Sequence, residues 1–347
     1  MKGYQFEDTQ GTFHLKKAEN ISYLYFPIAG EAGLKSSFTP NLGGDAKIDQ
    51  NTFLLEPVSA ENLVNNRNSR NFWCNVKGIG SWSLTGHSAE ELSKKFTEMQ
   101  DDSEVTAGFM WQKTTRESKK YQLRGEILSF IPVDKNVEIM LVTITNTGRM
   151  AQTVTPTAAI PLYGRSADNI RDHRHVTSLL HRIETTDTGV LVTPTLSFDE
   201  RGHQVNHMTY YCVGWSGNGE KPVDFYPTAE DFVGEGGNFE RPYAIVKNAE
   251  GVKAGTKIEG LEAVGGLHFS EITLEPEEEC SYLIFTGITE DIQEIRNLSK
   301  TYTTREKVLE ELEKTKAYWQ EKVNVAYHTG DSDFNQFMHW VSFQPIL

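Results

Sequence analysis

Alternation of hydrophobic and polar positions dominates the first 287 residues of the chain. In the stretch 136–148 (NVEIMLVTITNTG), apolar residues recur with a period of two, β-branched residues are frequent, and the run stops at Asn146-Thr147-Gly148. This pattern predicts a strand that ends in a turn. We expect further strands over 21–28, 51–55, 71–77, 80–86, 105–113, 122–131, 189–196, 208–216, 266–274 and 280–287. Ten or more strands with few helices predict a large sandwich or barrel, and therefore a mainly β fold.

Helical spacing replaces the alternation from about residue 288 onward. The segment 303–323 begins with a capping box, Thr303-x-x-Glu306, and carries one apolar face. That face comprises Val308, Leu312, Thr315, Trp319 and Val323. A shorter helix is expected over 288–302, and another begins after Asp331 or Ser332. A single helix, 88–100, is expected within the β region, with Ser88-x-x-Glu91 as its capping box.

The final residues, Phe343-Gln344-Pro345-Ile346-Leu347, are mostly apolar and follow a helix without a C-cap or a charged tail. We therefore expect that the chain is the N-terminal piece of a longer protein and that its last helix enters a larger apolar body. The length of 347 residues also exceeds the size at which a single core usually stops growing, which is about 250–300 residues.

The chain is acidic, with a net charge of −14. This charge argues against nucleic acid and an anionic membrane as partners, since both require a basic face. No apolar run approaches the ~20 residues of a membrane span, and the N-terminus lacks the apolar core of a signal peptide, so we expect a cytoplasmic protein. The cysteines Cys74, Cys212 and Cys280 are odd in number and far apart, which fits neither a disulfide framework nor a zinc site.

One short stretch, RSADNIRDHRHV (165–176), concentrates positive and titratable side chains in this acidic chain. Arg171, His173, Arg174 and His175 lie around Asp172. Guanidinium and imidazole groups donate directional hydrogen bonds, so the cluster is a candidate for holding an anionic or hydroxyl-rich ligand. The alternative is a solvated loop whose arginines pair with Asp168 and Asp172. We predict no metal site at His173-x-His175, because no cysteine or carboxylate is placed to complete a tetrahedral set.

Two other groups of residues are candidates for sugar chemistry. The acidic segment that contains Asp45, Asp49, Glu56 and Glu61 could supply a carboxylate pair, although a polar turn followed by a strand explains it as well. Trp73, Trp82, Trp111 and Trp215 could stack on sugars, but they lie among alternating strand residues, which favours packing.

Several longer segments resemble the N-terminal third of the glycoside hydrolase family 94 phosphorylases, a family that includes cellobiose and chitobiose phosphorylases. The resemblance is carried by AGEAGLKSSFTPNLGGDAKIDQNTFLLEPVSAENL (29–63), SRNFWCNVKGIGSWSLTG (69–86), RSADNIRDHRHVTSLLHR (165–182) and the helical end. The sequences of these segments are most similar to the 1,2-β-oligoglucan phosphorylase branch. The resemblance implies a β-supersandwich over 1–287, a helical linker over 288–330, and over 331–347 the first helix of a truncated (α/α)6 catalytic barrel.

The same resemblance implies an inverting phosphorolysis of β-linked gluco-oligosaccharides to α-glucose 1-phosphate. Inorganic phosphate is then the co-substrate and no cofactor is required. The catalytic acid of the family lies on the barrel, so no residue of this chain is expected to be catalytic, and this piece alone is expected to be inactive. In the family, a loop at the position of Arg171, Asp172, His173, Arg174 and His175 reaches the active site of the neighbouring subunit. The resemblance therefore implies a homodimer in which these residues bind substrate.

Two alternatives remain open at this point. The chain could be a stand-alone carbohydrate-binding β-domain. It could also be the equivalent part of a cyclic β-1,2-glucan synthase or of a related (α/α)6 glycoside hydrolase. The downstream sequence would separate these alternatives, because a phosphorylase requires phosphate ligands on its barrel.

Overall fold

The computed structural model describes residues 4–21, 24–58, 66–172, 174–199 and 202–343. Strands dominate this part of the chain, and their pairings are antiparallel, so the predicted mainly β fold is confirmed. The largest sheet has eleven strands. In spatial order they are β1 (Tyr4–Phe6), β2 (Phe13–Lys16), β9 (Asp102–Gly108), β10 (Trp111–Ser118), β11 (Leu123–Phe130), β12 (Val137–Asn146), β23 (Glu279–Thr289), β18 (Thr209–Ser216), β15 (Gly189–Val192), β14 (Arg182–Thr185) and β20 (Lys257–Glu259).

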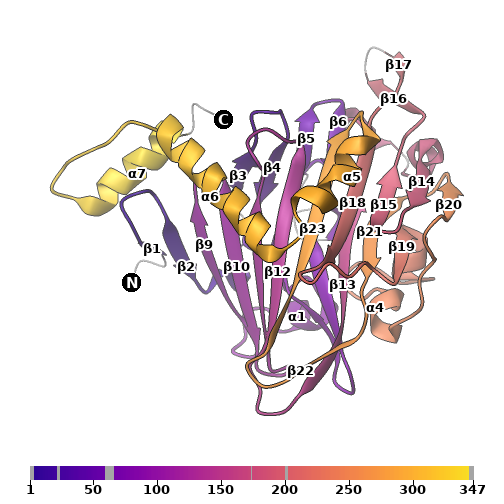
Figure 1. The fold of residues 1–347 in the computed structure, drawn as a ribbon, viewed down its shortest axis with the longest axis horizontal. Helices are drawn as coiled ribbons and strands as arrows, with labels where there is room; N and C mark the ends of the chain where they lie inside the picture. The colour runs from indigo at the N-terminus through magenta and orange to yellow at the C-terminus, as the bar shows by residue number, and fades with distance from the viewer. Residues whose placement is uncertain (1–3, 22–23, 59–65, 173, 200–201, 344–347) are drawn as a thin grey trace.

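Smaller sheets pack against this large sheet (Figure 1). The six-stranded sheet comprises β19 (Asp224–Thr228), β21 (Ala263–His268), β13 (Gln152–Leu162), β7 (Asn71–Val76), β8 (Gly80–Ser83) and β22 (Ile272–Leu274), the last of which pairs with β13. A four-stranded sheet comprises β3 (Phe26–Ala29), β4 (Lys35–Phe38), β5 (Ala46–Asp49) and β6 (Thr52–Leu55). A separate hairpin joins β16 (Leu196–Asp199) to β17 (Gly202–Val205).

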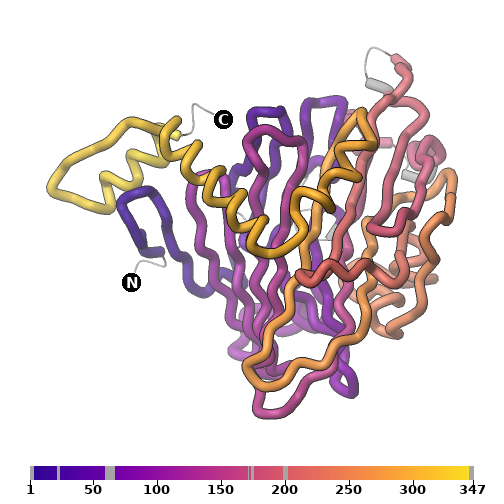
Figure 2. Tube along the Cα trace, viewed as in Figure 1, coloured from indigo at the N-terminus to yellow at the C-terminus, as the bar shows by residue number. Residues whose placement is uncertain are grey.

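The described ranges also contain helices. They are α1 (Ala89–Ser93), α2 (Arg174–Thr177), α3 (Ala229–Val233), α4 (Tyr243–Lys247), α5 (Ile292–Thr301), α6 (Arg305–Lys322) and α7 (Ser332–Phe343). Single 3-10 turns are η1 (Ala18–Asn20), η2 (Asn66–Asn68), η3 (Ala167–Arg171) and η4 (Ser178–Leu180). Helices α5 and α6 lie across the large sheet, and α7 lies beside β1 and β2 (Figures 1 and 2). No helix in the described ranges combines the length and the apolarity needed to cross a membrane.

Strand β12 shows how the sequence pattern builds these layers. Met140 and Ile144 face the core between the sheets, while Ile139 and Leu141 face the opposite side. On that opposite side they pack in one cluster with Val308 and Leu312 of α6, whereas Trp319 and Val323 pack with Phe109, Met110 and Phe343. All five residues of the predicted apolar face, Val308, Leu312, Thr315, Trp319 and Val323, are buried as predicted. Both faces of the strand are therefore buried, which explains why both phases of its alternation are largely apolar.

Several predicted boundaries were wrong because turns divide the predicted segments. The strand predicted over 105–113 is two strands, β9 and β10, joined at Phe109 and Met110, and Met110 has a positive φ of 63°. The predictions over 189–196 and 266–274 likewise each cover two strands. Of 21–28, only the end forms a strand, β3, and residues 22–23 lie outside the described part.

The helices begin at the predicted capping residues, except that the cap of α6 lies one residue later than predicted. Ser88 Oγ accepts a hydrogen bond from the Glu91 amide at 3.1 Å, which confirms the predicted start of α1, but the helix ends at Ser93 rather than at residue 100. Helix α6 is preceded by Thr304 instead of Thr303. Asp331 Oδ1 accepts from the Phe334 amide at 3.0 Å and so caps α7.

Tryptophans of the β region serve mainly packing, as predicted. Trp73, Trp82 and Trp215 are almost fully buried. Trp111 is partly buried, and the Lys316 ammonium of α6 lies 4.5 Å from its ring centroid. This contact joins α6 to the large sheet through a cation–π interaction.

Candidate functional site

The predicted cluster lies in a connection that follows β13. Arg171 is the last residue of η3, Asp172 follows it with an exposed side chain, and Arg174 and His175 begin α2. His173 lies outside the described residues, and so do the side chains of Arg171, Arg174 and His175. The backbone thus places the residues on one short loop, and their proposed contacts with a ligand stay a prediction.

Hydrogen bonds hold the first half of this loop in a fixed shape. The backbone amide of Phe53 donates to the carbonyl of Arg165 at 3.0 Å, and the amide of Ala167 donates to the carbonyl of Gln50 at 2.8 Å. Within the loop, Asn169 Nδ2 donates to Asp172 Oδ2 at 2.9 Å. Asp172 therefore orients Asn169, a partner that the sequence interpretation did not consider.

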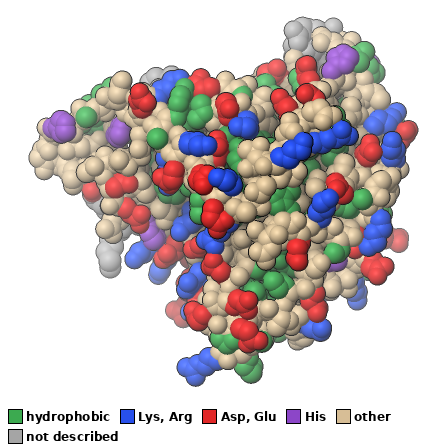
Figure 3. Space-filling model, viewed as in Figure 1, with side chains coloured by type: hydrophobic (Ala, Val, Ile, Leu, Met, Phe, Trp, Pro, Cys, Tyr) green, Lys and Arg blue, Asp and Glu red, His purple; other side chains and the backbone are tan. Residues whose placement is uncertain are grey.

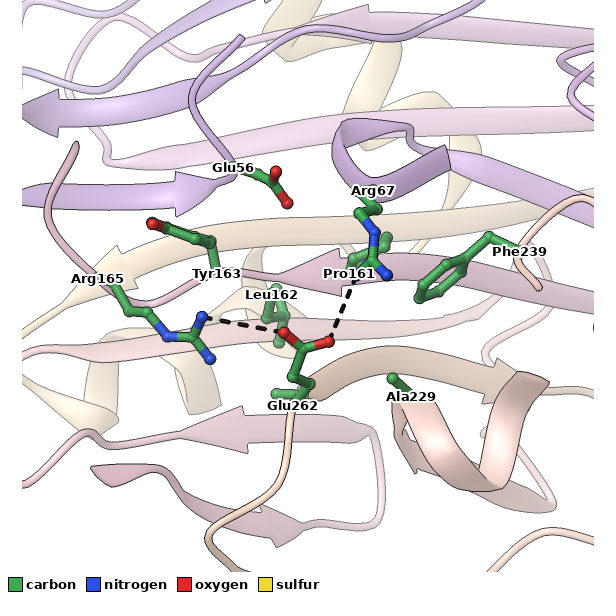
Figure 4. Close-up of a pocket in the computed structure, with 10 residues that line it drawn as sticks. Glu56, Arg67, Pro161, Leu162, Tyr163, Arg165, Ala229, Phe239 and Glu262 are labelled. Carbon is green, nitrogen blue, oxygen red and sulfur yellow. Dashed lines mark hydrogen bonds and ion pairs between the residues drawn. The ribbon is translucent and has the colours of Figure 1, made fainter. Parts of the chain in front are cut away.

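Arg165 forms the root of the loop and is buried, with 6% of its surface exposed. Its guanidinium carbon lies 5.2 Å from the ring centroid of Tyr163, and its Nη1 lies 4.0 Å from Glu262 Oε1. The other oxygen of Glu262 lies 3.4 Å from Nη1 of Arg67. One carboxylate thus connects two guanidinium groups from distant parts of the sequence (Figure 4).

The three residues of this ion network line a small chamber. Its volume is about 20 Å³, which is room for about one water molecule. The residues that line it are Glu56, Arg67, Pro161, Leu162, Tyr163, Arg165, Ala229, Phe239, Glu262 and Ala263. Glu56 points into the chamber from the side opposite Glu262 (Figure 4).

The carboxylate pair considered from the sequence takes a different form in the structure. Asp45 accepts a hydrogen bond from Ser37 Oγ at 3.0 Å and Asp49 from the Asn51 amide at 2.8 Å, so both have local structural contacts. Glu61 lies outside the described part of the chain. Of the described residues of this segment, Glu56 alone lines the chamber, where the second carboxylate is that of Glu262. No local pattern relates these two residues, because the end of β6 and the start of β21 meet only in the folded sheets.

His181 lies near Arg165 and stays neutral. It is fully buried, and its Nδ1 lies 3.2 Å from the carbonyl oxygen of Leu261. Burial, together with the nearby positive charge of Arg165, lowers the pKa of His181 from 6.5 to about 3. The imidazole of His181 therefore adds no charge next to Arg165 at neutral pH.

A larger groove adjoins the chamber through Arg67, Ala229, Phe239 and Glu262, which line both. Its volume is about 500 Å³, and α3 and the segment 234–240 form its other walls. Sequence reasoning selected neither Arg67 nor Glu262. Arg165 belongs to the stretch 165–176, but the sequence predicted no role for it. A single sequence does not indicate which isolated charges the fold brings together.

Comparison with known proteins places these observations in a family context. A family model described as "Glycosyl hydrolase 94, supersandwich domain" matches residues 55–305. No curated protein sequence matches the chain.

Solved structures that match the chain share little of its sequence. A protein described as a kojibiose phosphorylase from the human microbiome is 9% identical over 98% of this chain, with a TM-score of 0.48. A bacterial glucoamylase complexed with acarbose is 9% identical over 98% of the chain, with a TM-score of 0.45. The chain spans 42% and 40% of the lengths of these two proteins. A protein described as an aldose 1-epimerase from Escherichia coli K12 is 9% identical over 77% of this chain and 99% of its own length, with a TM-score of 0.41.

Proposed function

The chain belongs to the glycosyl hydrolase 94 family, and we propose that it is the N-terminal part of an inverting glycoside phosphorylase. The observation that carries this proposal is the match of the supersandwich model over residues 55–305, which includes the loop at 165–175. The proposed substrates are a β-linked gluco-oligosaccharide, with β-1,2 linkage as the first choice, and inorganic phosphate. The proposed product is α-glucose 1-phosphate.

In the proposed reaction, phosphate attacks the anomeric carbon of the terminal glucosyl unit and the bond to the leaving oxygen breaks. A carboxylic acid protonates that oxygen as it leaves, and phosphate itself is the nucleophile, so no second carboxylate is needed to activate water. We assign neither the acid nor the phosphate ligands to this chain. They belong to a catalytic barrel, of which residues 331–347 would be the first helix.

The proposed roles of the present domain are dimerisation and substrate recognition. Residues 1–287 would form the supersandwich and 288–330 the linker to the barrel. The loop residues Arg171, Asp172, His173, Arg174 and His175 would hold sugar hydroxyls in the active site of a partner subunit. The anchoring of Arg165 supports this role, since a recognition loop that starts from a buried, ion-paired residue loses less conformational entropy on binding.

Two other functions are consistent with the same family match. A stand-alone carbohydrate-binding domain would use the sheets without any barrel. A cyclic β-1,2-glucan synthase or a related hydrolase would keep the barrel but not the phosphate chemistry. Product formation that requires phosphate would distinguish a phosphorylase from these alternatives.

The test is a product assay on the protein expressed from its complete coding sequence. The enzyme is incubated with a β-1,2-linked glucotriose, with and without inorganic phosphate, and the products are separated by chromatography. A phosphorylase yields α-glucose 1-phosphate only when phosphate is present. Release of free glucose without phosphate would instead support a hydrolase, and absence of turnover with a bound trisaccharide would support the binding domain.

A further inference from the structure

The groove beside the chamber carries no assigned role, and we propose that it binds one pyranose unit of a neutral oligosaccharide, outside the loop at 165–175. The volume of about 500 Å³ is within the range of small-molecule sites. The residues that line the groove are Arg67, Ala229, Glu230, Val233, Gly234, Glu235, Gly237, Asn238, Phe239, Glu240 and Glu262. This inference goes beyond the proposed phosphorolysis, although the choice of a glucose oligomer as the probe rests on that proposed function.

The walls of the groove are held by backbone contacts. The Ala229 amide at the start of α3 donates to the carbonyl of Glu262 at 2.9 Å. This hydrogen bond joins α3 to the segment before β21, and both contribute to the lining of the groove. Opposite α3, Asn238 Oδ1 accepts from the Arg241 amide at 2.8 Å, and the carbonyl of Glu240 accepts from Ala89 at 2.7 Å. A preformed site of this kind avoids the cost of ordering its walls on binding.

A glycine allows the segment 234–240 to lie close to α3. A Cβ on Gly237 would lie 1.9 Å from the carbonyl oxygen of Val233, so only glycine fits at this position. The tight turn at 234–237 follows from that close approach.

The polar groups of the groove match the hydroxyl pattern of a sugar. Arg67 donates and Glu262 accepts, and the two groups lie side by side with 38% and 21% of their side chains exposed. A donor next to an acceptor can hold two vicinal hydroxyls, each of which donates and accepts. The partly buried ring of Phe239 lies next to them, with the Arg67 guanidinium 5.8 Å from its centroid (Figure 4). Aromatic carbon of this kind packs against the C–H groups of a pyranose.

The charge of the groove decides between ligand classes. Among the described residues, its lining carries four carboxylates, those of Glu230, Glu235, Glu240 and Glu262, and one guanidinium, that of Arg67. An anion such as inorganic phosphate would be repelled by this excess of negative charge. The mixture of acids with a single ion-paired arginine favours a neutral, hydroxyl-rich ligand. Elsewhere on the molecule, acidic and basic side chains are interspersed over the face that carries α5 and α6 (Figure 3).

Binding of β-1,2-linked glucotriose and of cellotriose to the 347-residue chain tests the proposal. Isothermal titration calorimetry is used on the wild type and on Phe239→Ala and Glu262→Gln, with the thermal midpoint of each variant checked first. We expect weak binding by the wild type and a loss of about tenfold or more in each groove variant, because each removes a direct contact. Glu271→Gln is the matched control, since Glu271 is an exposed glutamate outside the groove, and it should bind like the wild type. If Glu262→Gln does not fold, Phe239→Ala alone decides.

Several outcomes would overturn the groove assignment. One is a wild-type chain that binds neither trisaccharide at tens of millimolar. A second is unchanged binding in Phe239→Ala. A third is loss of binding in Arg171→Ala with the groove variants intact, which would place the sugar on the loop. Binding that is lost in the groove variants and kept in Arg171→Ala supports the groove, even if the complete protein turns out to have no phosphorylase activity.

Discussion

Arg70 and Glu138 form a two-point ion pair inside the domain, with 0% and 1% of their side chains exposed. Arg70 Nε donates to Glu138 Oε1 at 2.6 Å and Nη2 donates to Oε2 at 3.1 Å. Arg70 also donates to the carbonyl of Gly44 at 2.8 Å, and Glu138 accepts from Ser36 Oγ at 2.8 Å. Since Arg70 precedes β7, Glu138 lies in β12 and Ser36 lies in β4, this network connects the three main sheets.

Glu138→Gln should therefore destabilise the domain strongly. The substitution leaves the buried guanidinium of Arg70 without a counter-charge, and the loss of a partner from a buried pair costs about 3–5 kcal/mol. Urea unfolding followed by tryptophan fluorescence measures the change. Glu271→Gln, which breaks an exposed pair with Lys77, is the control and should change stability by less than about 1 kcal/mol. Equal effects of the two substitutions would contradict the assignment.

Arg171→Ala in the complete protein should raise the Michaelis constant for the oligosaccharide more than that for phosphate. The proposed role of Arg171 is to donate to sugar hydroxyls, and a charged hydrogen bond contributes about 1.5–3 kcal/mol, which corresponds to about tenfold or more in affinity. Initial rates are measured with each substrate varied in turn. Arg149→Ala is the matched control, because Arg149 is exposed in the turn between β12 and β13, at the opposite end of β13 from the loop. Equal shifts of both constants would remove Arg171 from the sugar site.

Acidification should destabilise the domain through two buried histidines. Burial, followed by the nearby charge of Arg116, lowers the pKa of His87 to about 4, and burial with Arg165 lowers the pKa of His181 to about 3. In the unfolded chain both titrate near 6.5, so the unfolded state binds more protons below that pH. The stabilising contribution is complete above about pH 6.5 and is lost as the pH falls toward 4 and 3 respectively, by up to about 1.4 kcal/mol per pH unit for each histidine.

His181→Asn should make that acid dependence shallower between about pH 6 and 4. The asparagine amide can still donate toward the Leu261 carbonyl but does not titrate. Stability is measured by urea unfolding at several pH values. His203→Asn removes an exposed histidine on β17 and should leave the slope as it is in the wild type. An unchanged slope in His181→Asn would show that His181 is not among the groups responsible.

Gly86→Ala should cost more stability than Gly78→Ala, although the two glycines have almost the same φ, +78° and +77°. Both substitutions force a side chain into the left-handed region, which costs of order 1–3 kcal/mol. At Gly86 the new Cβ would also lie 2.6 Å from the guanidinium carbon of the buried Arg116, whereas Gly78 has no atom within 4 Å. The difference between the two thermal midpoints therefore reports the displacement of Arg116. Equal midpoints would mean that Arg116 moves at no cost.

Sequence patterns correctly predicted those elements that depend on contacts between residues close together in the chain. The apolar face of α6 from Val308 to Val323 and the Ser88 cap of α1 were both read correctly, because each depends on residues within a few turns. The turn at Phe109 and Met110 was missed, since neither residue is a usual turn former and the positive φ of Met110 carries no sequence signal.

The candidate site could be predicted only in part from the sequence. The cluster around Arg171 was visible as a charge anomaly within twelve residues. The network of Arg67, Arg165 and Glu262 was not visible, because η2, the end of β13 and the start of β21 come together only through the order of strands in the six-stranded sheet. Which isolated charges join such a network depends on burial, and burial is determined only by the folded sheets.

The pairing of β12 with β23 has a consequence for synthesis of the chain on the ribosome. The register runs from Val137 opposite Gly287 to Thr145 opposite Glu279, so β12 gains its second neighbour only after residue 289 has been translated. At the usual 5–20 residues per second, this delay is on the order of ten seconds. Until then one edge of β12, in which six of ten residues are apolar, is open, and α6 is not yet present to cover it. The newly made domain therefore passes through a period of aggregation risk in which a chaperone would be of use, and any fragment that ends before residue 289 would remain in that state.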